Sequence, residues 1–209
     1  MLDKNSATAP PKPEAAWCSS TVTTAPVFLA ESRIVFSSSV SVYGTHKSFI
    51  KENSPFNNPN AYGTSKIMGE FALNINTNHS IVRFSSIYGN DMNQSTFIPK
   101  IIDQAKKTGQ ITILGNGSRL QDYIYIKDAV RILIETGINK KTGIFLGVYG
   151  KSYTNFKMSK IISKQLDGSG IIFKNRDDNP SFKYDNSWTL GVLKLKPGFS
   201  PEKGIKEML

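Results

Sequence analysis

Short apolar runs alternate with longer helical patterns along most of the chain. Continuous apolar runs predict buried strands at 34–36, 80–85, 111–114, 123–126 and 144–148. Apolar positions at helical spacing predict helices at 61–74, 97–107, 127–136 and 155–166. Strands that alternate with helices in this way are typical of an α/β chain with a mostly parallel sheet.

The first thirty residues follow a different pattern. Residues 1–26 are rich in Ala, Pro, Ser and Thr, which is typical of a loose leader. Residues 21–30 carry enough β-branched and apolar side chains for one strand, and Pro26 would confine that strand to a sheet edge. We therefore divide the chain into a divergent leader, 1–30, and a folded part, 31–209.

Composition narrows the class of protein. The 209 residues are 39% hydrophobic and 20% charged, which suits a globular domain with a sizeable core. The sequence has neither an apolar run of the roughly 20 residues that a membrane helix needs nor the pattern of a secretory signal. One cysteine, Cys18, and two distant histidines, His46 and His79, predict neither a disulfide nor a zinc site. These features favour the cytoplasm and no membrane partner.

The formal net charge is +10, and most of it falls after residue 100. A basic half is compatible with nucleic acid, a membrane surface, or a small polyanion such as a nucleotide diphosphate. The lysines are spread out, however, and no basic run has interleaved aromatic residues. This spacing favours a solvated surface, so we do not expect a nucleic-acid partner.

Candidate chemistry is concentrated in residues 36–44 (FSSSVSVYG) and 58–70 (NPNAYGTSKIMGE). Tyr62 and Lys66 are four residues apart and would share one face of a helix. An ammonium beside a phenol favours the phenolate and lowers its pKa from about 10, so the tyrosine can exchange a proton with a substrate hydroxyl. The three serines directly follow a buried strand. In parallel α/β sheets, active groups lie at the carboxyl ends of the strands.

Further motifs follow in order: 82–89 (VRFSSIYG), 115–128 (GNGSRLQDYIYIKD) and a closing segment within 190–204. From about Arg33 to Leu209 the set resembles the extended short-chain dehydrogenase/reductases. More narrowly, it resembles the NAD-dependent epimerase/dehydratase family, which acts on nucleotide sugars. The implied fold is α/β, an N-terminally truncated Rossmann-like parallel sheet with a small C-terminal substrate-binding part mainly from about 90 onward.

The resemblance also implies roles for individual residues. Ser39 matches the catalytic Ser/Thr, Tyr62 the acid/base, and Lys66 the residue that binds the nicotinamide ribose and lowers the tyrosine's pKa. Phe84 falls where the family's chain passes the nicotinamide. The positions that match the nucleotide-sugar contacts are Ser86, Gln121 and Arg176. The implied reaction is hydride transfer between NAD or NADP and a sugar carbon, with Tyr62 moving the proton.

Three departures from the family bear on the substrate. The family's 4,6-dehydratases carry an acidic pair directly after the catalytic hydroxyl residue, whereas this chain has Val40 and Ser41, which favours an epimerase or a sugar reductase. Gln121 stands where the family has an arginine on the phosphate, and Arg119 is a candidate substitute if both side chains point the same way. Ser86 replaces the usual asparagine.

The largest departure concerns the cofactor loop. The sequence has no glycine before Gly44, so it lacks the G-x-x-G-x-x-G loop that cradles the pyrophosphate. By resemblance, the strand at 34–36 would be the fourth of the usual sheet and would have an open edge. We expect residues 21–30, a second copy in a homodimer, or another chain that supplies the missing N-terminal half to cover this edge.

Three functions remain open. The first is an NAD(P)-dependent nucleotide-sugar epimerase or reductase, impaired as this chain alone, in the supply of sugar nucleotides for a polysaccharide. The second is a non-catalytic remnant or sugar-nucleotide-binding module of the same family. The third, a nucleic-acid binder, rests on charge alone.

Overall fold

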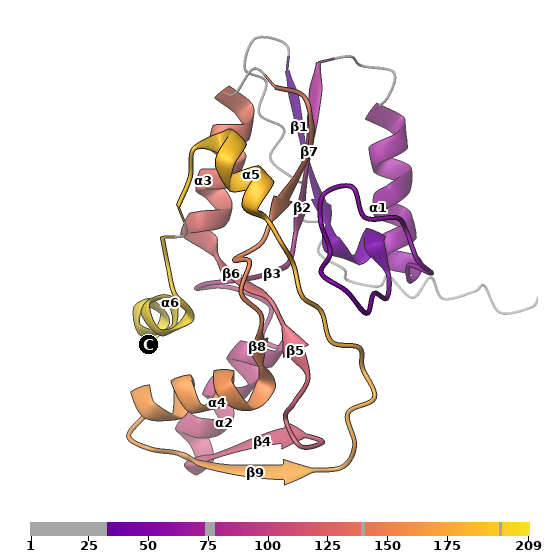
Figure 1. Cartoon of the computed structure of the whole chain (residues 1–209). Helices are drawn as coiled ribbons and strands as arrows, with labels where there is room; N and C mark the ends of the chain where they lie inside the picture. Colours follow the sequence, from indigo (N-terminus) through magenta and orange to yellow (C-terminus); the bar gives the residue numbers. More distant parts are fainter. Residues whose placement is uncertain (1–32, 74–77, 139–140, 197) are drawn as a thin grey trace, which may run out of the picture.

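The computed structural model describes residues 33–73, 78–138, 141–196 and 198–209. The leader, the strand predicted at 21–30 and Cys18 lie outside the described residues. Two lobes are visible in Figure 1, which we call the sheet lobe (β1, β2 and β7 with α1, α3 and α5) and the second lobe (α2, β4, α4 and β9).

A three-stranded parallel sheet forms the centre of the sheet lobe, in the order β1-β2-β7. Its strands are β1 (Ile34–Ser39), β2 (His79–Phe84) and β7 (Gly143–Gly147). The strand predicted at 34–36 continues through the three serines, because Ser37, Ser38 and Ser39 pair with Val82, Arg83 and Phe84. The predicted α/β class and the parallel direction of the sheet are confirmed.

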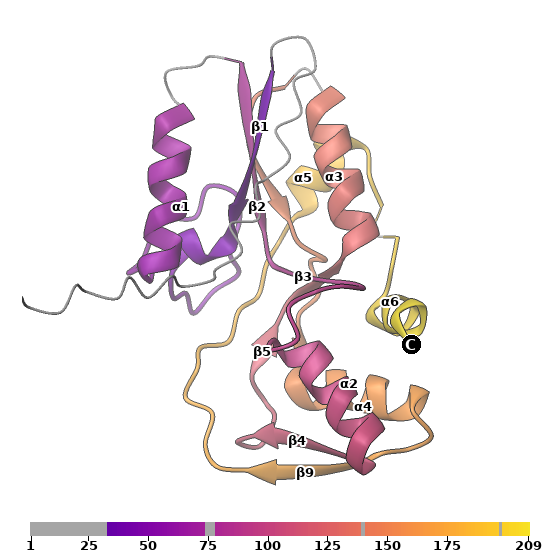
Figure 2. The same cartoon turned by 180° about the vertical axis from the view of Figure 1, so that it is seen from behind.

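Helices cover the two faces of this sheet. α1 (Ala61–Ala72) lies on one face, and α3 (Ile126–Ile138) and α5 (Ser187–Leu193) lie on the other (Figures 1 and 2). Beneath α3 the core contains Val35, Val82 and Phe145, which pack against Ile132 and Leu133. Among the described residues β1 pairs only with β2, so its other edge has no strand partner there.

The second lobe packs two helices against a small parallel sheet. Its elements are α2 (Phe97–Thr108), β4 (Gln110–Leu114), α4 (Asn155–Gln165) and β9 (Gly170–Lys174). β4 and β9 pair in register from Gln110 opposite Gly170. The core between helices and sheet includes Ile101, Ile113 and Met158. α2 ends at Gly109, whose φ of 65° is the left-handed conformation that glycine adopts at helix ends.

Short elements connect the lobes. They are η1 (Val40–Tyr43), β3 (Ser86–Tyr88), β5 (Leu120–Gln121), β6 (Tyr123–Tyr125), β8 (Tyr153–Thr154) and α6 (Pro201–Met208). β3 pairs with β6 in parallel and β5 with β8 antiparallel. α6 places Ile205 in the same core as Tyr88 and Tyr125, so the C-terminal helix closes the second lobe's core from the side of β3 and β6.

The predicted turn after β4 is confirmed. Gly115 and Gly117 both have positive φ, 60° and 71°. A Cβ on Gly117 would lie 2.7 Å from Ile113 Cδ1 and 2.9 Å from Phe156 Cβ, so only glycine fits there. Within the described ranges, no helix has the length and apolar character that crossing a membrane requires.

Candidate functional site

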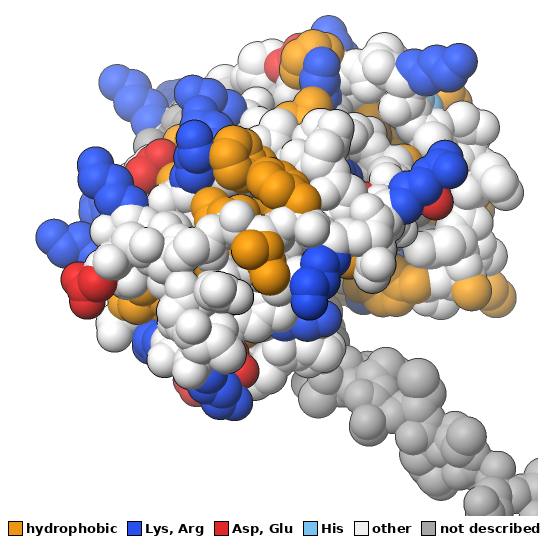
Figure 3. Space-filling view, turned by 90° about the horizontal axis from the view of Figure 1, so that it is seen from below, with side chains coloured by type: hydrophobic (Ala, Val, Ile, Leu, Met, Phe, Trp, Pro, Cys, Tyr) orange, Lys and Arg blue, Asp and Glu red, His pale blue; other side chains and the backbone are white. Residues whose placement is uncertain are grey.

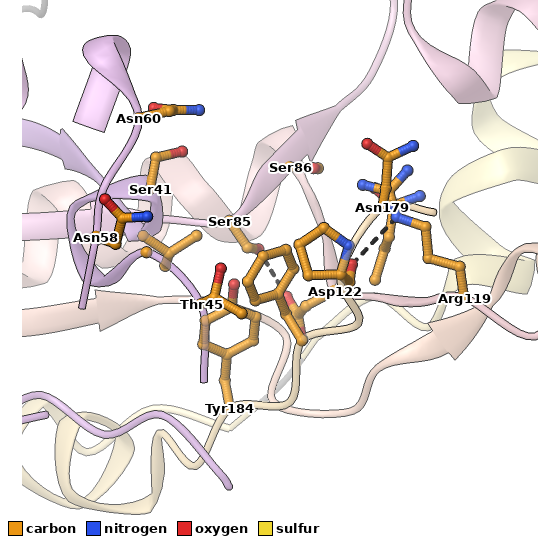
Figure 4. Close-up of a pocket in the computed structure, with 15 residues that line it drawn as sticks. Ser41, Thr45, Asn58, Asn60, Ser85, Ser86, Arg119, Asp122, Asn179 and Tyr184 are labelled. Carbon is orange, nitrogen blue, oxygen red and sulfur yellow. Dashed lines mark hydrogen bonds between the residues drawn. The ribbon is translucent and has the colours of Figure 1, made fainter. Parts of the chain in front are cut away.

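A cavity of about 400 Å³ lies between the two lobes (Figure 4). Ser41 and Asn60 lie on one side of it, at η1 and the start of α1. Arg119 and Asn179 lie on the opposite side, before β5 and in the loop that follows β9. Its volume and mixed polar lining are those of a small-molecule site.

Asp122 lies between these two sides and is almost fully buried. Its carboxylate accepts hydrogen bonds from Ser85 Oγ (2.6 Å) and from the backbone N–H groups of Tyr149 and Gly150 (both 2.9 Å). Burial raises the pKa of Asp122, and these three bonds act against that increase. All three donors come from segments that follow β2 and β7, so Asp122 joins the end of the sheet to the second lobe.

The first turn of α1 packs directly on η1. Asn60 caps the helix by accepting a hydrogen bond from Gly63 N–H at 2.8 Å. A Cβ on Gly63 would lie 2.3 Å from the carbonyl oxygen of Ser41, so glycine is required for this close approach. The contact fixes the helix start, and with it Tyr62, beside the segment that follows Ser39.

Tyr62 and Lys66 lie on one face of α1, as predicted. Lys66 Nζ is 5.8 Å from the centre of the Tyr62 ring and donates a hydrogen bond to Ser37 C=O at 3.3 Å. The Tyr62 side chain is 55% exposed. Ser39, at the end of β1, accepts a hydrogen bond from Ser41 N–H at 3.1 Å and so caps η1.

A buried ion pair fastens the far end of α1 to the sheet. Arg83 of β2 donates two hydrogen bonds to Glu70, at 3.0 and 2.6 Å, and both side chains are almost fully buried. Ser38 Oγ donates to the same carboxylate at 2.5 Å, and the Arg83 guanidinium lies 4.7 Å from the centre of the Tyr43 ring. The Arg83 guanidinium, the Glu70 carboxylate and the Ser38 hydroxyl thus all have hydrogen-bond partners, as groups buried around an ion pair require.

The family model for the NAD-dependent epimerase/dehydratase family matches residues 20–164, well over half of the chain. The chain belongs to this family. The matched residues include β1, which carries Ser39, and α1, which carries Tyr62 and Lys66.

Curated members of the family are similar over part of their length. A protein of Methanocaldococcus jannaschii called "Putative UDP-glucose 4-epimerase" is 27% identical over 85% of this chain and 62% of its own. The CDP-abequose synthase of Salmonella typhimurium is 27% identical over 61% of this chain and 46% of its own. The chain thus spans less than two thirds of the length of these relatives.

Solved structures of epimerases share the fold. A UDP-N-acetylglucosamine 4-epimerase from Methanobrevibacter ruminantium superposes with a TM-score of 0.77 at 24% identity, over 84% of this chain and 61% of that one. A UDP-glucuronic acid 4-epimerase from Bacillus cereus, solved with UDP-glucuronic acid and NAD, gives a TM-score of 0.75 at 20% identity and covers 84% and 60%. These likenesses confirm the Rossmann-like fold.

The structure brings only part of the set inferred from family resemblance into the cavity. Ser86 and Gln121 line it. Ser39, Tyr62 and Lys66 lie outside the lining, although their neighbours Val40 and Asn60 belong to it. These three residues, which match the family's proton-transfer residues, therefore lie next to the cavity and not in its lining.

Two further positions from the family motif lie apart from the cavity lining. Phe84 is buried, and its ring occupies the space that a Cβ on Gly147 would fill. Arg176 is 87% exposed, pairs with Asp178, and is not among the lining residues. Its proposed contact with a nucleotide sugar remains a prediction.

The loop that follows β9 forms one wall of the cavity, and the sequence analysis did not predict this. Asn179, Pro180, Phe182 and Tyr184 all line the cavity. Backbone bonds place this loop: Phe182 N–H donates to Leu120 C=O at 3.0 Å. No motif marks these residues, and only the pairing with the segment around Leu120 brings them to the site.

The residues present fit one half of the family's dinucleotide. Lys66 and the exposed Tyr62 phenol lie together beside the end of β1, where a nicotinamide ribose would find both a hydroxyl and an ammonium. The sequence has no G-x-x-G-x-x-G loop, so no described segment would cradle the pyrophosphate. Among the described residues no group of three His, Cys, Asp or Glu side chains is placed to hold a metal ion.

Part of the positive charge is clustered, because five lysines of α4 and α6 line one open hollow: Lys157, Lys160, Lys164, Lys203 and Lys206. On the face shown in Figure 3, lysine and arginine side chains lie at separate positions around an apolar area.

Proposed function

We propose that this chain carries the proton-transfer and substrate-binding part of an NAD(P)-dependent nucleotide-sugar epimerase or reductase. The observation that carries the proposal is the Tyr62–Lys66 pair, held beside Ser39 and next to the cavity between the lobes. Glu70 and Arg83 hold one end of α1 and Gly63 the other, so the pair occupies a fixed position.

In this proposal Tyr62 exchanges a proton with a hydroxyl of the sugar, and the Lys66 ammonium lies 5.8 Å from the centre of the Tyr62 ring. Ser39 orients the same hydroxyl or carbonyl through its Oγ. Tyr62, Lys66 and Phe84 would hold the nicotinamide side of the cofactor, whose chemistry when bound is hydride exchange at a sugar carbon.

Ser86 and Gln121, both in the cavity lining, are proposed to contact the nucleotide sugar, as is Arg176. The substrate class is supported by the relatives, whose names carry UDP- and CDP-linked sugars. NAD is favoured over NADP because the Bacillus cereus complexes contain NAD. Val40 and Ser41 in place of an acidic pair support an epimerase or reductase over a 4,6-dehydratase. We place the activity in the cytoplasm, in the supply of precursors for a polysaccharide.

Full activity would require the part of the fold that this chain lacks relative to its relatives. The free edge of β1 among the described strands supports a partner there, either a second copy or a chain that carries the missing half. The exposed aliphatic residues Val130, Ile134 and Ile138 on α3 also support contact with a second copy or another chain. The isolated chain is therefore proposed to be impaired in catalysis.

A second candidate is a sugar-nucleotide-binding module without catalysis. It is favoured by one observation: Ser86 and Gln121 line the cavity, whereas Tyr62 lies outside the lining with over half of its side chain exposed.

Calorimetry on the full chain with NADH and with UDP-, CDP- and dTDP-sugars separates the two candidates. For the enzyme, we expect micromolar NADH binding that weakens about tenfold or more in Lys66→Ala. Lys100→Ala, which removes an exposed lysine from α2, is the matched control and should bind as the wild type does. Tyr62→Phe should retain most binding and abolish turnover once the fold is complemented.

Sugar-nucleotide binding without NADH binding up to millimolar concentration would support the binding module instead. Absence of both kinds of binding would overturn both candidates.

A further inference from the structure

The hollow between α4 and α6, which we call the lysine hollow, has a volume of about 970 Å³. None of its described lining residues belongs to the cavity between the lobes. Three of its five lysines come from α4 and two from α6, far apart in the sequence, and the packing of α4 against α6 brings them together (Figure 1). The lysine hollow is therefore a product of the tertiary structure.

The five ammonium groups of the lysine hollow are not neutralised by ion pairs. All five side chains are exposed, and among the described residues none of them forms an ion pair. Glu202 is the one acidic residue in the described lining, and Glu207, the other acidic residue of α6, pairs with Lys127 instead. Five ammonium groups and one carboxylate leave the hollow with a net positive charge.

Three of these ammonium groups lie over aromatic rings. The distances from Nζ to the ring centre are 4.8 Å for Lys157 on Tyr153, 4.5 Å for Lys160 on Phe156 and 4.2 Å for Lys203 on Phe199. The attraction between a cation and a ring face holds each charge at a defined position before a ligand binds. Because lysines cover these ring faces, the same faces are not available to stack on nucleic-acid bases.

The two helices that carry the lysines are fixed relative to each other. Met158 and Ile162 of α4 and Ile205 of α6 lie in the same buried core. At the surface, Gln165 Nε2 donates a hydrogen bond to Glu202 C=O at 2.7 Å. The lysine hollow thus has a stable backbone frame, and only the lysine side chains need to adjust to a ligand.

The spacing of the lysines on α4 matches a helical or extended partner. Lys157, Lys160 and Lys164 share one face of the helix and span about 10 Å along its axis. Ile161, on the same face, and Leu209, which follows α6, also line the hollow. A complementary ligand therefore carries several negative charges around an aliphatic side chain.

We propose that the lysine hollow binds an acidic amphipathic segment of a partner protein. Its Asp and Glu carboxylates pair with the lysines, and an aliphatic side chain packs against Ile161 and Leu209. The described lining contains no arginine, the residue whose planar guanidinium binds phosphate with two parallel hydrogen bonds, so carboxylates are favoured over phosphates. A flat lipid surface would leave the aliphatic lining of a hollow uncovered. The inference does not depend on the function proposed above.

Fluorescence anisotropy on the full chain tests the proposal with a labelled synthetic peptide of glutamates that has leucines at helical spacing. A second peptide has alanine in place of leucine, and a third has glutamine in place of glutamate. We expect the first peptide to bind most tightly and the glutamine peptide not to bind. Binding should weaken with added salt, because the Debye length falls from about 10 Å at 0.1 M to about 3 Å at 1 M.

The decisive variant is Lys160→Glu/Lys164→Glu, which places two negative charges on the α4 side of the hollow. It should weaken the leucine peptide about tenfold or more, because two attractions become repulsions. Lys100→Glu/Lys106→Glu, at exposed positions of α2, changes the net charge equally and should weaken binding less than about twofold. Circular dichroism of each variant checks that the fold is intact.

Two further variants separate the charged from the apolar contribution. Lys164→Gln/Lys206→Gln removes charge without repulsion and should weaken the leucine peptide about threefold. Leu209→Ser should weaken the leucine peptide about two- to fivefold and leave the alanine peptide unchanged, since Leu209 is 41% exposed in the free protein and becomes covered by the ligand.

Nucleic acid and membrane are tested with the same variants, using single-stranded and duplex DNA oligonucleotides and vesicles that contain phosphatidylglycerol. Oligonucleotide or vesicle binding that is tighter than peptide binding and is lost in Lys160→Glu/Lys164→Glu would overturn the proposal in favour of that ligand. No peptide binding up to millimolar concentration would also overturn it, as would equal losses in Lys160→Glu/Lys164→Glu and in the α2 control.

Discussion

The second lobe and the sheet lobe differ in how completely their helices α2 and α3 bury apolar side chains. In the second lobe, α2 places Ile98, Ile101 and Ile102 in the core. In the sheet lobe, α3 buries Ile132 and Leu133 but leaves Val130, Ile134 and Ile138 substantially exposed, and β1 has no outer partner among the described strands. The second lobe exposes Leu114 of β4 and Phe173 of β9 instead, so the sheet lobe differs in the apolar face of its helix α3 and in the outer edge of β1, both of which suit contact with further protein.

The two lobes also differ in what secures their helices. In the second lobe, α2 and α4 rest on apolar contacts with β4 and β9. On the α1 face of the sheet lobe, much of the attachment is polar, through Glu70, Arg83 and Ser38. A lobe secured in this way is sensitive to the loss of one charge, because the remaining charge stays buried without a partner.

The largest effect is expected from breaking that ion pair. Arg83→Met should lower the free energy of unfolding by about 3–5 kcal/mol, since it leaves the Glu70 carboxylate buried and unpaired. Urea unfolding measures the loss. Hydrogen exchange followed by peptide mass should show faster exchange in β1 and β2 than in β4, because the second lobe's core is separate.

The control for this variant is an exposed pair in the second lobe. Asp103→Asn breaks the Lys107–Asp103 contact of 3.0 Å on the surface of α2 and should cost less than about 1 kcal/mol. Equal losses from the two substitutions would show that the sheet lobe does not depend on its buried network. The double variant Glu70→Leu/Arg83→Met should cost less than the sum of its single changes.

A smaller effect is expected where α6 closes the second lobe's core. A Cβ on Gly204 would lie 2.2 Å from the buried Tyr88 hydroxyl, so Gly204→Ala should destabilise the fold by about 1–3 kcal/mol through overpacking. Gly191→Ala, in α5 with nothing within 4 Å of the added methyl, is the matched control. The control should be neutral or stabilising by up to about 1 kcal/mol, because alanine is the better helix former. Thermal unfolding of both variants tests the difference, and two neutral results would mean that α6 is loosely docked.

The smallest effect on stability is expected from substitutions of the exposed α3 residues. These substitutions test whether the chain associates with a second copy of itself. Val130→Lys together with Ile134→Lys should alter the free energy of unfolding by no more than about 0.5 kcal/mol per site. If this surface packs against a second copy, the wild type should self-associate and the double variant should be monomeric by light scattering after size exclusion.

Leu114→Lys, at an exposed apolar position of β4, controls for general solubility and should not change the association. A wild-type chain that runs as a soluble monomer, both whole and after removal of residues 1–30, would contradict cover by a second copy or by the leader.

Elements with strong periodicity were predictable from the sequence. The helices at α1, α2, α3 and α4 and the strands at β1, β2, β4, β6 and β7 were expected within a few residues of their observed bounds. Their apolar spacing reflects burial on one face, which local sequence records. The three serines of β1 were expected after the strand and not in it, because small polar residues do not signal a strand that gains its pairing from β2.

Other elements carry no such signal. β3, β5 and β8 are two or three residues long, too short for any periodicity, and exist because a partner strand is present. β9 was missed, although it carries apolar residues, because its partner β4 lies some sixty positions earlier. Such pairings are tertiary contacts and leave little trace in local composition.

The sequence by itself determined the α/β class, the family, and the placement of Tyr62 and Lys66 on one helical face, because helical spacing alone brings residues four apart together. Only the tertiary structure decided which side chains share the cavity. Arg119 and Asn179 line the same side of the cavity because Leu120 exchanges hydrogen bonds with Ser181 and Phe182. Arg176, close to that loop in sequence, remains in solvent beside Asp178. The physical reason is that long-range backbone pairing, and not the identity of a residue, sets which side of the loop faces the cavity.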